Sequence, residues 1–265
     1  SALVIRPRHH STAATSSRLL ALAATLGVQE KSIWNAVYLA LLSLLDGSSD
    51  VVGSVVTHGR PELPGGDRMV GMFLNSLPIR VDMTGMRWAD LVLAAEAELR
   101  LLNTVRHFPL VDIQARTGMS FAASLFNFVN FHVYQKNITD RQLVIGGFFD
   151  ETNYCVTFQV EKLHDQQRYD VRVSLDPSVF DQDFRERIRG YVEAIIEQLL
   201  ERSQERIDQA VLLSAAERTQ LLATWNDTSR PYPNDKCIHE LFESQALHSE
   251  DAAAVVCGEE TLSYA

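Results

Sequence analysis

Residues 70–80 read Val-Gly-Met-Phe-Leu-Asn-Ser-Leu-Pro-Ile-Arg, an apolar run that contains one amide and one hydroxyl side chain, Asn75 and Ser76. Polar side chains inside a buried strand need hydrogen-bond partners. Taken from its residues alone, the run is typical of an edge strand whose polar pair faces water. We expect such a strand to end at Pro78, because proline has no amide hydrogen to donate to a sheet.

Length and charge set the class of protein. A chain of 265 residues with 46% hydrophobic residues can form one large domain or two smaller ones around a packed core. Acidic residues outnumber basic ones by 34 to 24, and no basic run is interleaved with aromatic residues, so no nucleic-acid partner is expected. No apolar stretch approaches the roughly 18 residues of a membrane helix, and residues 1–6 lack the order of a signal peptide. We therefore expect no membrane partner and a cytoplasmic location.

Residues that could perform chemistry are scattered. Cys155, Cys237 and Cys257 are few, odd in number and far apart, which argues against a disulfide framework and a zinc cluster. The histidines have no second ligand at metal-binding spacing, and the serines lack the Gly-x-Ser-x-Gly setting of a nucleophile. The sequence predicts no metal site and no self-contained catalytic site.

Hydrophobic periodicity predicts an α/β arrangement for the first three quarters of the chain. Stripes of apolar residues at helical spacing alternate with short runs rich in valine and aromatic residues. Helices are predicted at 19–26, 33–44, 88–105 and 181–202, and strands at 50–57, 125–134, 154–161 and 168–175. This order predicts layers of helices on a sheet.

The composition changes after residue 202. Residues 203–208 are polar, and Ser214 with Glu217 forms a capping box that predicts a short amphipathic helix. Residues 228–235 hold two prolines and few apolar side chains, which is typical of a linker. A helix at 238–247 and a strand at 253–257 then begin another unit. We divide the chain into a lobe at 1–202, a linker at 203–235 and a fragment of a second domain at 236–265.

The opening stretch closely resembles the fifth core motif of condensation domains from nonribosomal peptide synthetases. That motif reads Gly-x-Phe-x-Asn-Thr/Ser-x-Pro-x-Arg, and each named place is filled here by Gly71, Phe73, Asn75, Ser76, Pro78 and Arg80. We assign Gly71, Phe73, Pro78 and Arg80 to the structural part of the motif.

Other stretches extend the resemblance. Residues 51–53 and 58–61 are similar to an early strand and turn of the family, and residues 106–110 resemble its sixth motif without the usual Gln-Asp pair. Residues 121–131 resemble the seventh motif, but Ala122 stands where an aspartate is common. These departures leave the subtype of the domain open. The lobe of a related epimerization or heterocyclization domain is an alternative.

The C-terminal part resembles the region that comes after a condensation domain. Residues 212–218 and 225–228 are similar to the linker that joins a condensation domain to an adenylation domain. Residues 238–243 resemble the first helix of that adenylation domain, and residues 262–265 resemble the start of its first core motif. By this resemblance, residues 1–202 are the C-terminal lobe of a condensation domain.

The resemblance implies a two-lobed, chloramphenicol-acetyltransferase-like fold, in which a mixed sheet with packed helices forms each lobe and a tunnel runs between the lobes. It implies partners: the N-terminal lobe, donor and acceptor peptidyl carrier proteins, and the adjacent adenylation domain. The carriers deliver substrates on phosphopantetheine, so no cofactor bound directly by this chain is expected. An acceptor amine attacks the donor thioester and an amide forms.

The family's His-His-x-x-x-Asp-Gly motif belongs to the other lobe. His9 and His10 are followed by residues 11–15, Ser-Thr-Ala-Ala-Thr, without Asp-Gly at the required offset. We therefore expect no catalytic residue in this chain and no activity from it alone. The alternative is a carrier-protein docking module without chemistry.

Candidate site residues come from two stretches. Asn127, Asn130 and His132 form a polar series in an aromatic strand, and buried amides are costly unless they are paired. The series is either a structural network or part of a tunnel wall. By the resemblance, our candidates for the wall are Asn75, Ser76, Asn127, Asn130 and His132, with a positioning role, since holding two tethered reactants together replaces a bimolecular encounter.

Overall fold

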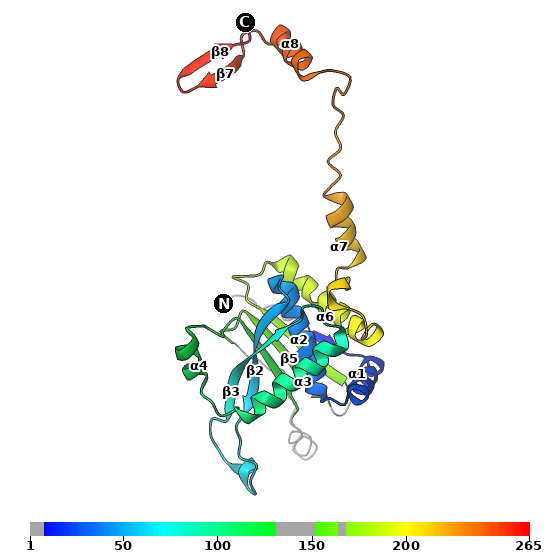
Figure 1. Ribbon diagram of the computed structural model, residues 1–265, viewed down its shortest axis with the longest axis vertical. Coiled ribbons are helices and arrows are strands. Elements are labelled where there is room, and N and C mark those ends of the chain that lie inside the picture. The colour runs from blue at the N-terminus through cyan, green and yellow to red at the C-terminus, as the bar shows by residue number, and fades with distance from the viewer. Residues whose placement is uncertain (1–7, 131–151, 164–167) are drawn as a thin grey trace, which may run out of the picture. The chain divides into compact units, whose positions relative to one another are not determined.

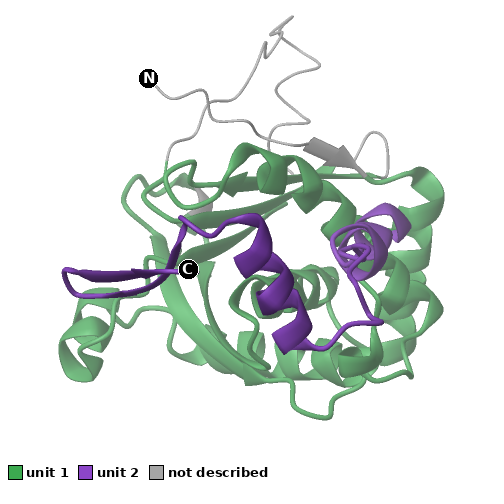
Figure 2. Ribbon diagram, turned by 90° about the horizontal axis from the view of Figure 1, so that it is seen from above, with its two compact units in different colours: residues 1–214 green, residues 215–265 purple. Residues whose placement is uncertain are grey.

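The structure, a computed structural model, describes residues 8–130, 152–163 and 168–265. The chain divides into two compact units, Ser1–Ser214 and Ala215–Ala265 (Figure 2).

The first unit is built on a six-stranded sheet in the order β1-β6-β5-β4-β2-β3 (Figure 1). Strand β2 pairs with β4, and β4 with β5, in parallel, whereas the other neighbours are antiparallel. The sheet is therefore mixed, as predicted. The strands are β1 Arg8–His10, β2 Asp50–His58, β3 Leu74–Asp82, β4 Ser124–Val129, β5 Val156–Leu163 and β6 Arg168–Leu175.

Four helices supply the apolar side chains that pack on this sheet: α1 Ala13–Leu26, α2 Glu30–Asp46, α3 Trp88–Thr104 and α6 Gln182–Glu201. The helix ends follow the sequence signals. Gly27 and Gly47 end α1 and α2 with φ values of 67° and 66°, the left-handed conformation that glycine adopts without strain. Thr12 begins α1 by accepting a hydrogen bond from the amide of Thr15 at 3.1 Å. The predicted helices are confirmed within a few residues, except that α1 begins earlier than its stripe.

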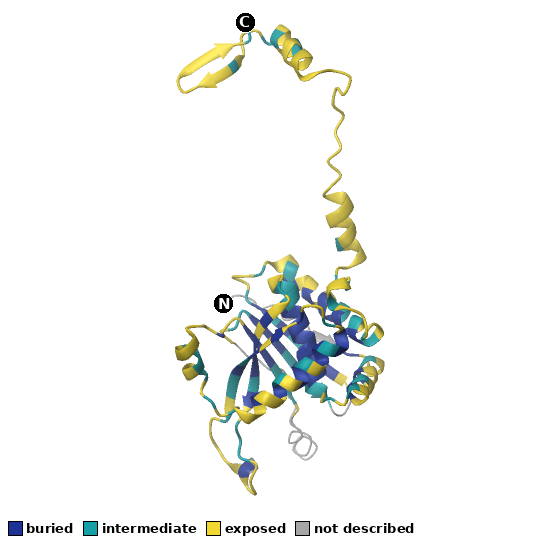
Figure 3. Cartoon of the chain, in the orientation of Figure 1, coloured by how far each residue is buried: buried dark blue, intermediate teal, exposed yellow. Residues whose placement is uncertain are grey.

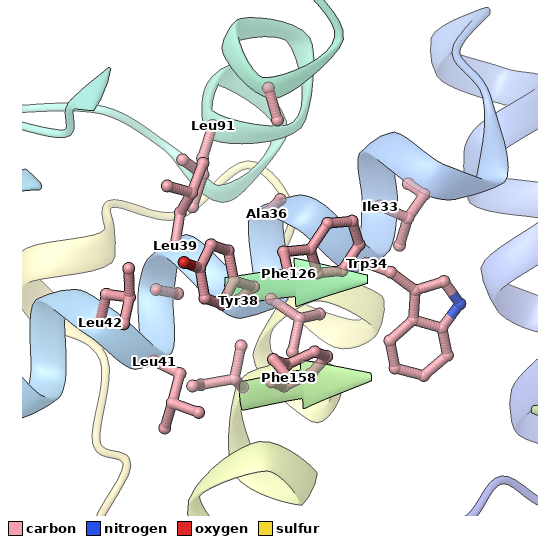
Figure 4. Close-up of a cluster of buried hydrophobic side chains, with 14 of the residues drawn as sticks. Ile33, Trp34, Ala36, Tyr38, Leu39, Leu41, Leu42, Leu91, Phe126 and Phe158 are labelled. Carbon is pink, nitrogen blue, oxygen red and sulfur yellow. The ribbon is translucent and has the colours of Figure 1, made fainter. Parts of the chain in front are cut away.

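Aromatic side chains form the centre of the core. Figure 4 shows Tyr38 of α2 beside Phe126 of β4 and Phe158 of β5, with ring centroids 5.4 Å and 6.0 Å from the tyrosine ring. Tyr38 donates to Ser124 at 2.7 Å, and burial raises the pKa of its hydroxyl, which stays a neutral donor. A Cβ atom at Gly53 would lie 2.6 Å from the Tyr38 oxygen, so only glycine fits beneath this ring. Figure 3 shows the buried residues gathered in the strands and the helices packed on them.

Strand β3 differs from its prediction in its bounds. It begins at Leu74 and continues through Pro78 to Asp82, so the expectation that Pro78 ends the strand is wrong. In the sheet formed by the described residues β3 is one of two edge strands, and Pro78 lies opposite Ser54 of β2. An edge strand tolerates proline because one side of its backbone has no neighbouring strand to accept an amide hydrogen.

Among the described residues of the first unit, helix α4, strand β1 and the 3-10 helices Gly66–Arg68 and Ile207–Gln209 have no counterpart in the sequence prediction. Helix α4, Leu110–Thr117, follows Pro109. Pro109 is the N-cap residue of α4, whereas the sequence prediction uses it only as the end of the preceding helix. Strand β1 pairs with β6, its three residues opposite positions 170–172. The strand predicted at 125–134 is β4, which ends at Val129, and residues 131–134 lie outside the described residues.

The second unit holds α7 Ala215–Thr219, a π-helical turn over Gln220–Thr224, α8 Ile238–His248, and the hairpin β7 Ala253–Cys257 and β8 Glu260–Ser263. The rings of Phe242 and Tyr264 lie 5.2 Å apart. No residue of this described unit is buried, and its large apolar side chains are exposed, for example Ile238 at 86%. Across the described residues of both units, no helix is long and apolar enough to span a membrane.

Candidate functional site

The two polar residues of the opening motif lie on opposite faces of the sheet. Asn75 is opposite Thr57 in the β2–β3 ladder, and Leu77, two residues on, is opposite the fully buried Val55. Because side chains alternate along a strand, Asn75 shares the face on which the helices pack, and Ser76 points to the other face. We call the face of Ser76 the open face. The two residues do not form one surface.

Asn75 connects the edge strand to the segment between α3 and α4. Its side-chain nitrogen donates to the carbonyl oxygens of Arg106 at 3.1 Å and Phe108 at 2.8 Å. His107, between these residues, packs against Gly59, where a Cβ atom would lie 2.6 Å from the imidazole Nδ1. The geometry therefore favours the structural alternative for Asn75, because its donor group is used to hold a loop.

Ser76 has a partner that the sequence does not indicate. Its hydroxyl oxygen lies 3.1 Å from the hydroxyl of Tyr154, and both residues are half-buried. Tyr154 precedes β5 and is 78 positions away in the chain. A lone tyrosine before a strand has no local signal of such a role, since only the sheet order brings it to Ser76.

Asn127 shares the open face with Ser76. Val55 of β2 is opposite Phe126 of β4, so Asn127 projects to the same side as Ser76. It is half-buried and lies opposite Gln159 of β5, which is also half-buried. Asn130 follows the end of β4 and is exposed. His132 lies outside the described residues.

A charged cluster continues this face toward β6. Arg172 is opposite Gln159 and donates to Asp170 at 2.6 Å and 2.8 Å and to Glu161 at 3.3 Å. The backbone of β1 passes beside it, with His10 opposite Asp170. The open face thus carries hydroxyl, amide and charged side chains on four strands, of which Ser76, Asn127 and Gln159 are half-buried and Asp170 is buried.

Two of the remaining motif residues, Phe73 and Arg80, contact charged side chains. The guanidinium of Arg60 lies 4.5 Å from the ring centre of Phe73. It also donates to the carbonyls of Gly66 and Met69, and these contacts connect parts of the loop before β3. Gly71 is exposed. Arg80 is exposed and makes two hydrogen bonds to Asp50, at 2.9 Å and 2.7 Å, which lower the pKa of that carboxyl.

Comparisons with known proteins agree with this fold. The family model described as the condensation domain matches residues 8–222. One component of the linear gramicidin synthase of Brevibacillus parabrevis is 30% identical over 262 residues, which is 95% of this chain and 5% of that protein. Tyrocidine synthase 3 of the same species is 30% identical over 241 residues, 88% of this chain and 4% of that protein. The chain thus spans a small part of these relatives.

Solved structures show the same fold. A four-domain nonribosomal peptide synthetase bound to AMP and glycine matches with a TM-score of 0.75 at 13% identity, covering 99% of this chain and 21% of that one. The first condensation domain of the calcium-dependent antibiotic synthetase matches with a TM-score of 0.63 at 18% identity, covering 79% of this chain and 48% of that one. Condensation domains have the chloramphenicol-acetyltransferase-like fold, so the predicted fold class is confirmed. The chain belongs to the condensation domain family of nonribosomal peptide synthetases.

Proposed function

We propose that this chain is the C-terminal lobe of a condensation domain and supports amide bond formation in a synthetase module. The observation that carries the proposal is the family match over residues 8–222, together with relatives that are peptide synthetases. The reactants are a donor thioester and an acceptor amine, each tethered to a carrier protein by phosphopantetheine. This chain itself needs no directly bound cofactor for that role.

The contribution of this lobe is to position the reactants. Ser76 and Asn127 line the wall of the tunnel on the open face, with Tyr154 holding the Ser76 hydroxyl at 3.1 Å. Asn130 and His132 belong to the same proposed wall. Asn75 contributes to the fold, through the loop that it holds, and is not part of this wall. Hydroxyl and amide groups that bond the tethered amides raise the effective concentration of amine and thioester, which lowers the entropic part of the barrier.

The chemical step is an acyl transfer. The amine nitrogen attacks the thioester carbonyl, the C–N bond forms, the C–S bond breaks, and the thiol leaves with the proton that the amine loses. We assign the group that moves this proton to the His-His-x-x-x-Asp-Gly motif of the N-terminal lobe, because His9 and His10 lack the Asp-Gly of that motif.

The C-terminal residues extend the proposal to neighbouring domains. We assign residues 203–235 to the linker and residues 236–265 to the opening of an adenylation domain. Exposed apolar side chains on α8 and on the β7–β8 hairpin support this assignment, because such side chains are buried in a complete domain. Val256 and Leu262, exposed at 65% and 68%, are examples.

The proposal is tested with loaded donor and acceptor carriers. The parent module is expected to form the dipeptidyl thioester, and this polypeptide alone is expected to form none above background. If the parent module binds both carriers but forms no amide, the chain belongs to a docking module and the proposal fails. Product from this polypeptide alone that is lost on His10→Ala contradicts the assignment of proton transfer to the other lobe.

A further inference from the structure

Lys31 occupies an unusual position for a positive charge. It is the second residue of α2, at the end of the helix where the backbone dipole disfavours cations. Its ammonium donates to the carbonyl of Val56 at 3.3 Å, and the described part of the chain supplies it with no other hydrogen bond and no ion pair. Burial lowers the pKa of this ammonium. Two of its three donor hydrogens therefore have no partner among these residues.

The nearby carboxylate is occupied by other donors. Glu96 of α3 is buried and accepts hydrogen bonds from the Gln29 amide at 3.0 Å and the Ser32 hydroxyl at 2.5 Å. Arg100 donates to its other oxygen at 2.6 Å and forms an ion pair with it. Glu96 thus closes the N-terminus of α2 and is neutralised by Arg100. It leaves the charge of Lys31 uncompensated.

A second lysine near the same end of α2, Lys162, has an anionic partner. Lys162 donates to both carboxylate oxygens of Glu30 at 2.7 Å and 2.8 Å. Glu30 also accepts from the Tyr169 hydroxyl at 2.6 Å, so its carboxylate is fully used. Lys162 therefore has an anionic partner among the described residues, whereas Lys31 has none.

The space beside Lys31 is a small surface depression with both polar and apolar walls. A small depression of about 40 Å³ is lined by Lys31, Arg100, Glu96, Gln29, Asn103, Leu99 and Leu102. Its formal charge is plus one, because two cations face one carboxylate. Lysine is a common phosphate ligand that acts as a point charge. The side-chain amides of Gln29 and Asn103, which line the same depression, are further donors.

We propose that this depression binds a phosphate group, with Lys31 as its charge partner. The group comes either from free phosphate or from the phosphodiester that links a phosphopantetheine arm to a serine. Phosphate binding here is independent of the proposed amide-forming role, because it needs only the charge and donors of this depression.

Thermal unfolding of the chain measures the binding. Phosphate is titrated against chloride at constant ionic strength, and the melting temperature is expected to rise with phosphate concentration, as for a ligand that binds only the folded state. Lys31→Met keeps the aliphatic stem and removes the charge. It is expected to weaken phosphate binding by at least about tenfold, since a charge-assisted hydrogen bond is lost. In chloride alone, Lys31→Met is expected to melt at the same temperature or higher.

Two controls make the result specific. Lys162→Met removes a paired lysine at the same helix end and is expected to lower the melting temperature while keeping the phosphate response. Asn103→Ala changes an exposed side chain at the mouth, leaves the fold intact and is expected to weaken phosphate binding several-fold. An equal response from acetate, an undiminished response in Lys31→Met, or no response in the native chain overturns the proposal.

The source of the phosphate is decided by a second ligand. A serine peptide carrying phosphopantetheine is titrated by calorimetry against the native chain and Lys31→Met. Binding of the peptide at lower concentration than inorganic phosphate, lost in Lys31→Met, supports the phosphodiester. Binding of inorganic phosphate without the peptide supports a free anion, and binding of neither overturns the site.

Discussion

The side-chain nitrogen of Asn75 lies 2.8 Å from the carbonyl oxygen of Phe108, 33 residues away in the chain. One amide on an edge strand thereby fixes the segment that joins α3 to α4. Ser76, the next residue, reaches the opposite face and the hydroxyl of Tyr154. A two-residue polar element thus has two separate uses, one in the fold and one on the surface proposed for the reaction.

Asn75→Ala is expected to destabilise the chain by about 1–3 kcal/mol, because two half-buried carbonyl groups lose their donor. Urea unfolding measures the change in the free energy of unfolding. Asn75→Asp is a matched variant that keeps the size but removes the donor, and it is expected to destabilise at least as much as the alanine variant, because its carboxylate would face two carbonyl oxygens. A free energy within about 0.5 kcal/mol of the native value in both variants would contradict the structural role.

Gly53→Ala is expected to lower the free energy of unfolding by about 1–3 kcal/mol, because the new Cβ atom would overlap the buried ring of Tyr38. The control is Gly190→Ala in α6, where nothing lies within 4 Å of the added Cβ. That change is expected to stabilise the chain by up to about 1 kcal/mol, since alanine favours a helix. Similar changes in the free energy of unfolding from both substitutions would contradict the close packing of Tyr38 against Gly53.

The hydrogen bonds of Glu96 predict that the folded state loses stability at acidic pH. Burial raises the pKa of its carboxyl, but hydrogen bonds from Ser32, Arg100 and Gln29 outweigh burial and hold the pKa below its ordinary value. A depressed folded pKa contributes stability above the ordinary pKa of glutamate, about 4.3, and this contribution is lost as the pH falls through the folded pKa. Glu96→Gln is therefore expected to flatten the dependence of stability on pH below about 5.

The matched control for Glu96 is Glu193→Gln, at an exposed ion pair with Arg189. It is expected to leave the pH dependence nearly unchanged, because exposed ion pairs contribute little. Chemical unfolding between about pH 3 and pH 6 gives the two profiles. If Glu96→Gln has the same slope as the native chain, the hydrogen bonds to Glu96 do not stabilise the folded state.

The helices and most strands could be predicted because their signals are local. The stripe that ends at Gly27 and the valine-rich run of β2 each depend on neighbouring residues. Helix α4 escapes the sequence prediction because Phe108-Pro109 indicates the end of a helix, whereas Pro109 also begins the next one. Pro78 gives a wrong strand boundary for a different reason. Its effect depends on whether the strand lies at an edge, which the strand order decides.

The candidate site could be predicted only in part, because it depends on register. The sequence identifies Asn75 and Ser76 as polar residues in an apolar strand, but their separate surroundings follow from the pairing of β3 with β2. Tyr154 and the open depression beside Lys31 have no signal in the sequence, since each depends on contacts between segments far apart in the chain. The motif resemblance indicates the family, and the strand pairing places Asn75 and Ser76 on opposite faces of the sheet.

The rate of amide formation in a single turnover of the parent module tests the central claim, that the open face of the sheet positions the reactants. Asn127→Leu removes an amide from that face at similar volume, and Asn75→Ala alters the other face. We expect Asn127→Leu to slow the transfer at least about tenfold with a nearly unchanged melting temperature. Asn75→Ala should lower the melting temperature while its rate, per folded molecule, stays near the native value. A native rate in Asn127→Leu, with both carriers bound, would contradict the account.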